Sequence, residues 1–77
     1  MNIERLSAMA NDIARFFHAE PDHAIAVDGI SGHIRKYWEP RMRKQIIAYA
    51  KSDNHDELSE LAHEGILRLA SMDTAHA

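Results

Sequence analysis

Apolar side chains recur along the chain at steps of three and four residues, the spacing of one face of an α-helix. The pattern divides the chain into four segments, which we predict as helices over about residues 3–18, 22–37, 40–51 and 55–72. No alternation of apolar and polar residues, the mark of a half-buried strand, persists for four residues. The sequence therefore predicts a single all-α domain over residues 1–77, a small bundle of about four helices joined by short links.

Residues that start or stop helices lie at the boundaries of the first three segments. Asn2 can cap the first helix, and Pro21 marks the stop that follows it. Glu39 and Pro40 separate the second segment from the third. Proline disfavours helical backbone angles at the residue before it and suits the first position of a new helix. These residues predict a sharp corner between the second and third helices.

The second and fourth segments leave two boundaries open. Asp28-Gly29 is a turn-like dipeptide inside the second segment, so a break near Gly29 is the alternative to one continuous helix. Asn54 and Glu57 have the spacing of a capping box before the fourth helix. Residues 73–77 are predicted to form a frayed tail.

Composition narrows the class of protein. The chain has 77 residues and no cysteine, which excludes disulfides and thiolate metal sites and favours a reducing cytoplasm. No apolar run approaches the roughly 18 residues of a membrane span, and the N-terminus lacks a signal pattern. A core this small makes a monomer marginal, so a homodimer of the isolated chain stays open.

Six histidines raise the question of a metal site. Glu20 and His23, and again Glu60 and His63, have the Glu-x-x-His spacing of carboxylate-bridged di-metal bundles. Such ligands must project from continuous helices into a shared interior. Pro21 places Glu20 outside the second helix, and the second pair lies opposite the apolar stripe of its helix. We therefore predict no metal site.

Catalytic residues are not expected either. There is no cysteine nucleophile, no serine stands in a recognisable His/Asp arrangement, and no glycine-rich phosphate loop is present. The chain is not predicted to be an enzyme by itself.

Charge is distributed unevenly along the chain. Residues 1–32 carry a net charge of −3, residues 33–51 of +5 and residues 52–77 of −5. A basic middle is either compensated within the chain or faces an acidic partner. The basic segment 35–44 also superficially resembles a helix-turn-helix, which makes a nucleic-acid-binding module the alternative function. The net negative charge and the acidic fourth helix argue against nucleic acid.

Several apolar residues fall outside the predicted core. Ile25, Gly29 and Gly32 share a face of the second helix, where two glycines would leave a shallow groove. Phe16 lies at the edge of the apolar stripe of the first helix, and Leu67 lies away from the apolar stripe of the fourth. On so small a core this surplus indicates a docking surface, with ordinary scatter of exposed residues as the alternative.

Two stretches, residues 9–17 (MANDIARFF) and 33–43 (HIRKYWEPRMR), resemble the delta subunit of the soluble, NAD-dependent, molybdenum-containing formate dehydrogenases. The resemblance covers about residues 3–50, and the run Trp-Glu-Pro-Arg-Met-Arg is its specific part. Tyr37 and Glu39 stand where the family pattern has Phe and Asp, which keeps an aromatic and an acidic residue in place. The fourth helix carries no matching motif.

The resemblance implies a small accessory subunit rather than a catalyst. Its partner would be the large catalytic subunit of the complex, which holds a bis-molybdopterin guanine dinucleotide and iron–sulfur clusters. The complex also carries FMN and oxidises formate with NAD⁺. The delta subunit would support assembly or maintenance of the active enzyme and bind none of these cofactors itself.

We predict that the contact surface centres on the corner between the second and third helices. Trp38 would be its apolar anchor, and a plain core tryptophan is the equal alternative. Arg41 and Arg43 would pair with carboxylates or a cofactor phosphate, since the planar guanidinium suits both. The predicted partner-binding residues are Trp38, Arg41, Met42, Arg43, Arg35 and His33, and a second contact face would consist of Ile25, Gly29 and Gly32.

Overall fold

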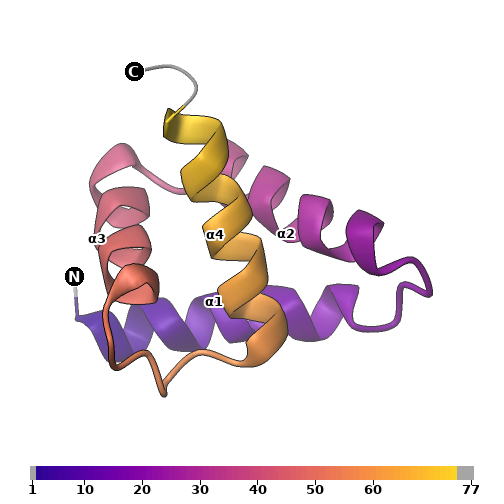
Figure 1. Ribbon diagram of the computed structural model, residues 1–77, viewed down its shortest axis with the longest axis horizontal. Coiled ribbons are helices and arrows are strands. Elements are labelled where there is room, and N and C mark those ends of the chain that lie inside the picture. Colours follow the sequence, from indigo (N-terminus) through magenta and orange to yellow (C-terminus); the bar gives the residue numbers. More distant parts are fainter. Residues whose placement is uncertain (1, 75–77) are drawn as a thin grey trace.

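Four helices make up the residues that the computed structural model describes, which are residues 2–74, with side chains to residue 72. They are α1 (Ile3–Phe17), α2 (His23–Tyr37), α3 (Pro40–Lys51) and α4 (Glu60–Thr74). In Figure 1, α4 stands between α3 and α2 and crosses α1, and it packs against all three, most extensively against α2. The described residues contain no strand, which confirms the all-α prediction. None of these helices is long and apolar enough to span a bilayer.

The first two helices begin at side-chain caps. The Asn2 side-chain oxygen accepts hydrogen bonds from the backbone N–H of Glu4 at 2.7 Å and of Arg5 at 3.4 Å. The Asp22 carboxylate accepts in the same way from Ala24 N–H at 3.0 Å. These bonds satisfy donors that have no partner within the helix. Since Asp22 is the cap, α2 begins one residue later than predicted.

Helix α2 runs through Gly29 without a break, so the alternative of an interrupted second helix is not realised. The glycine serves close packing instead. A Cβ atom at Gly29 would overlap the ring of Phe17, which lies against the helix there. Gly65 of α4 plays the same part, because a Cβ atom at that position would overlap the buried Ile30 side chain. The two glycines let α2 approach α1 and α4 closely.

The fourth helix begins at Glu60, five residues later than predicted. Its first turn is capped by the Ser59 hydroxyl, which accepts a hydrogen bond from Ala62 N–H at 3.2 Å. The side chain of Asn54 instead caps a turn in the linker, accepting from the backbone two residues on. The predicted capping box of Asn54 and Glu57 was therefore wrong about where the helix starts.

Long-range hydrogen bonds hold the linker that precedes α4. The Asn11 side chain of α1 donates to the Glu57 carbonyl and accepts from Ser59 N–H, both at 2.8 Å. The Tyr49 hydroxyl of α3 accepts from Glu57 N–H at 3.1 Å. These bonds satisfy backbone groups of the linker, among them the Glu57 carbonyl and the Ser59 N–H, which a helix starting at residue 55 would have paired internally.

The outer helix ends differ slightly from the predicted ones. Helix α1 ends at Phe17 rather than at residue 18. Helix α4 continues to Thr74, so the first two residues of the predicted tail, 73–77, belong to the helix. The remainder of that predicted tail lies outside the described residues.

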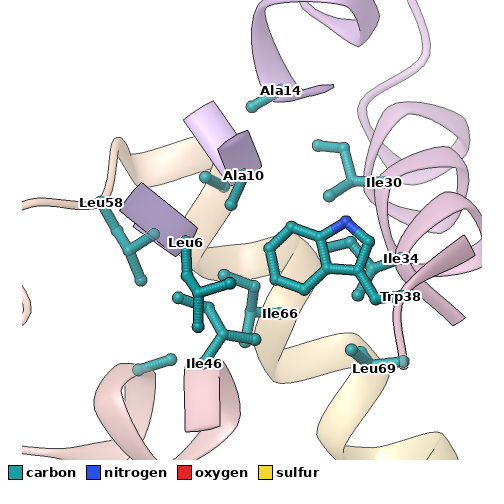
Figure 2. Packing of buried hydrophobic residues seen from close by; sticks show 12 residues of the cluster. Leu6, Ala10, Ala14, Ile30, Ile34, Trp38, Ile46, Leu58, Ile66 and Leu69 are labelled. Atoms are coloured by element: carbon teal, nitrogen blue, oxygen red, sulfur yellow. The ribbon is translucent and has the colours of Figure 1, made fainter. Parts of the chain in front are cut away.

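All four helices and the linker contribute to one apolar core. Figure 2 shows the indole ring of Trp38 inside this cluster, beside Ile34 and near Ile66 and Leu69. The buried cluster consists of Leu6, Ala10, Ala14, Ile30, Ile34, Trp38, Ile46, Ala50, Leu58, Ala62, Ile66 and Leu69. Its continuity across the helices fixes the corner at which α2 meets α3.

Candidate partner-binding surface

The corner between α2 and α3 is formed by two extended residues. Trp38 has φ −90° and ψ 141°, and Glu39 has φ −65° and ψ 152°. Pro40 then occupies the first position of α3. The extended backbone of Glu39 is the conformation that a following proline imposes, and the local sequence therefore sets the corner.

Trp38 and Tyr37 differ sharply in exposure although they are neighbours in the sequence. Trp38 is only 6% exposed and belongs to the core, so the core interpretation applies to this tryptophan. In the isolated chain it offers no ring to a partner. Tyr37, by contrast, is 65% exposed. The exposed aromatic side chain at the corner is thus Tyr37, which is not among the predicted contact residues.

Arg43 ties α3 to the end of α2. Its Nη1 donates hydrogen bonds to the carbonyl of Arg35 at 2.9 Å and to that of Trp38 at 3.2 Å. The side chain is half-buried, and its Nε has no hydrogen-bond partner among the described residues. A cation suits the C-terminal end of a helix, where carbonyl groups lack partners. We expected Arg43 to pair with a partner's carboxylate. Instead its Nη1 is engaged within the chain, where it joins α3 to the end of α2.

Met42 also faces inward, half-buried against the core. Three other predicted residues, Arg35, Arg41 and His33, are exposed. The predicted set therefore divides into side chains that build the corner and side chains that it presents to solvent.

Aromatic and cationic groups meet on the exposed side of the corner. The rings of His33 and Tyr37 lie one helical turn apart with centroids 4.8 Å from each other. Lys36 Nζ lies 5.4 Å from the centroid of the Tyr37 ring, within the range of a cation–π interaction. An aromatic face flanked by cations suits a ligand that carries both apolar groups and carboxylates.

The cations of α3 are not compensated by ion pairs within the described chain. Arg41, Lys44 and Lys51 are exposed and take part in no ion pair with the side chains of residues 2–72. Ion pairs join Arg15 to Asp12 at 3.1 Å, His23 to Glu64 at 2.7 Å and Arg68 to Asp28 at 3.0 Å, and none of them involves α3. The exposed cations of α3 are therefore accessible to an acidic partner.

The predicted second contact face is only partly open. Ile25 is 55% exposed, and a Cβ atom at Gly32 would meet nothing within 4 Å. At Gly29, however, the Phe17 ring fills the space that a groove would occupy. The expectation of a groove is therefore corrected at Gly29, whereas Ile25 and Gly32 remain accessible.

The histidine and carboxylate pairs are used in structural contacts. His23 Nε2 lies 2.7 Å from a Glu64 carboxylate oxygen, and His63 Nε2 lies 2.8 Å from the Ala50 carbonyl oxygen. His63 is half-buried, contrary to the solvent-facing position expected for it, and stacks on His55 with centroids 4.0 Å apart. Among the described residues no three His, Asp or Glu side chains are grouped so that they could hold a metal ion.

An open depression of about 790 Å³ lies at the other end of α2. Its lining comes from the end of α1 and the starts of α2 and α4, and includes Phe17, His23 and Glu64. No residue of the α2–α3 corner lines it.

Comparison with known protein families identifies the chain as a member of one of them. Residues 5–66 match the family of NADH-dependent formate dehydrogenase delta subunits, FdsD. Because the match spans most of the 77 residues, including the whole corner, the chain belongs to this family, and the resemblance noted in the sequence is confirmed. No curated protein and no solved structure matches the chain.

Proposed function

We propose that this chain is a non-catalytic accessory subunit of an NAD-dependent formate dehydrogenase complex. It binds the molybdenum-containing catalytic subunit and supports assembly or maintenance of the active enzyme in the cytoplasm. Membership of the delta-subunit family is the observation that carries this proposal. The redox groups of such a complex, namely bis-molybdopterin guanine dinucleotide, iron–sulfur clusters, FMN and NAD, would be bound by the other subunits.

The proposed contact surface is the exposed side of the α2–α3 corner. Arg41, Arg35 and His33 would contact the partner directly, since all three are exposed there. Trp38 and Arg43 would hold the backbone of the corner from behind, through the core and through hydrogen bonds. Met42 would support it by packing on the core.

Removing the chain from its native host tests the proposed function. We expect extracts of the deletion strain to oxidise formate with NAD⁺ at a clearly lower rate per catalytic subunit, and a plasmid-borne copy to restore the rate. The physical reason is that a subunit bound only to the folded enzyme stabilises it by mass action. The rate and the amount of catalytic subunit are measured together. Unchanged specific activity, and unchanged thermal inactivation of the enzyme, would contradict the proposal.

Nucleic-acid binding through residues 35–44 makes a different prediction. In a helix-turn-helix the first residues of the second helix must reach base edges, but Met42 and Arg43 turn inward and leave Arg41 and Lys44 exposed. We expect the chain to bind duplex DNA no more tightly than a generic acidic protein does at physiological salt, as measured by fluorescence anisotropy. Submicromolar binding with a steep salt dependence, lost in Arg41→Ala/Lys44→Ala, would favour the nucleic-acid module instead.

A further inference from the structure

We propose that an acidic, partly apolar segment of the dehydrogenase partner docks along one side of α2, on a surface that joins the two contact faces considered above. This surface, called here the α2 strip, consists of Phe16, Ile25, His33, Lys36 and Tyr37. The inference rests on the proposed function, because it assigns the occupant to the partner in the formate dehydrogenase complex.

The α2 strip is continuous by helix geometry. Ile25, Gly29, His33 and Tyr37 follow one another at intervals of four residues and therefore lie along one side of α2. The Phe17 ring covers Gly29 in the middle of this row. Phe16 packs edge-to-face on Phe17 with centroids 5.1 Å apart, which widens the row.

Most of the exposed large apolar side chains of the described chain lie on this strip. Phe16 is 77% exposed, Tyr37 65% and Ile25 55%. The fourth, Leu67, is 39% exposed and lies on α4. Two of the three, Ile25 and Tyr37, are on α2, and Phe16 is on α1 beside the Phe17 ring that packs on α2. Single exposed apolar residues are normal, whereas several on one side of a small domain indicate a contact surface. Phe16 and Tyr37 are also of the residue types that dominate interface energetics.

Charge complementarity identifies the kind of occupant. The Tyr37 end of the strip carries Lys36 and adjoins Arg41 at the start of α3, and neither cation forms an ion pair within the described residues. At the Ile25 end, Asp22 caps the helix with its carboxylate. The occupant therefore places its carboxylates beside Lys36 and Arg41 and its apolar side chains along the rest of the strip. A second copy of this chain in parallel orientation would bring the two basic ends together, which is unfavourable, and an antiparallel copy is distinguished by the sedimentation measurement below.

The test measures binding of purified chain variants to the formate dehydrogenase complex isolated from a strain that lacks this chain. We expect Tyr37→Ser and Phe16→Ser each to raise the dissociation constant at least about tenfold, because each removes an exposed aromatic anchor. Leu67→Ser is the matched control, with an expected change below about twofold, because its side chain lies off the strip. Both aromatic side chains are mostly exposed, so circular dichroism should show all three variants folded.

A charge pair of variants tests the chemistry of the occupant. We expect Lys36→Glu to raise the dissociation constant at least about tenfold and to flatten its dependence on salt, because the like charge repels an acidic segment. Lys51→Glu, at the far end of α3, should change it less than about threefold.

Two sets of results would overturn the inference. One is wild-type affinity in both Tyr37→Ser and Phe16→Ser. The other is self-association, measured by sedimentation, that these variants abolish while affinity for the complex stays unchanged, which would assign the strip to a homodimer. Failure of the wild-type chain to bind the complex at all would instead contradict the proposed function.

Discussion

Replacing Trp38 with alanine is expected to lower the free energy of unfolding by about 3–5 kcal/mol, the usual cost of truncating a buried tryptophan. The ring is 6% exposed and lies among Ile34, Ile66 and Leu69 in the centre of the core. A domain of 77 residues has a total stability of roughly 4–12 kcal/mol. The substitution therefore removes a large share of it and is expected to leave the chain partly unfolded at 25 °C.

Urea denaturation followed by circular dichroism measures this effect. Trp38→Phe is the graded control, because it keeps an aromatic ring in the cavity and should cost clearly less. The decisive contrast is with Tyr37→Ser, one residue away, whose exposed side chain should change stability by no more than about 0.5 kcal/mol. A Trp38→Ala variant with wild-type stability but weakened binding to the complex would show that the tryptophan acts at the interface and not in the core.

Replacing Arg43 with alanine is expected to cost about 2 kcal/mol of unfolding free energy, the scale of hydrogen bonds made by a charged group. The variant loses both bonds from Nη1 to the last turn of α2 and the corner between α2 and α3. It also removes the buried Nε, which has no hydrogen-bond partner in the described chain. Because an unpaired buried donor is unfavourable, its removal keeps the loss of stability from being larger.

Arg41→Ala is the matched control for Arg43→Ala, since it removes the same side chain two residues earlier on an exposed position. We expect its stability to change by no more than about 0.5 kcal/mol while its affinity for the complex falls. Arg43→Lys should recover only part of the lost stability, because an ammonium group lacks the guanidinium fork. Equal stability of the two alanine variants would show that Arg43 does not hold the corner.

Capping residues, prolines and helical periodicity predicted those helix ends that depend on neighbouring residues. Asn2 caps α1 as predicted, and α3 runs over Pro40–Lys51 with the predicted bounds. Asp28-Gly29 is a turn-like dipeptide, and a break there was the alternative to a continuous helix. The helix is continuous, and the glycine instead leaves room for the Phe17 ring. Helix periodicity and caps thus predicted the fold class and placed six of the eight ends of the described helices within one residue.

Contacts between residues far apart in the chain account for what could not be predicted. The start of α4 depends on the linker being held by Asn11, 46 and 48 residues away from its partners. Asn54 and Ser59 are both good capping residues, and only these distant bonds decide between them. No pattern within the linker carries that information.

Trp38 is buried for a reason that the periodicity contains. It lies four residues after Ile34, and its backbone N–H still donates to the Ile34 carbonyl, so the indole ring stays on the core side of α2. The core alternative for this tryptophan was therefore the correct one. The sequence pattern did not predict that Arg43 bonds to the end of α2.

Copurification through a tag on this chain, expressed at native level in its own host, tests the central claim most directly. The account predicts that the molybdenum-containing catalytic subunit elutes with the wild-type chain in stoichiometric amount. It also predicts that the subunit is lost from the Tyr37→Ser eluate and retained with Leu67→Ser. Recovery of the folded wild-type chain without any formate dehydrogenase subunit would contradict the account.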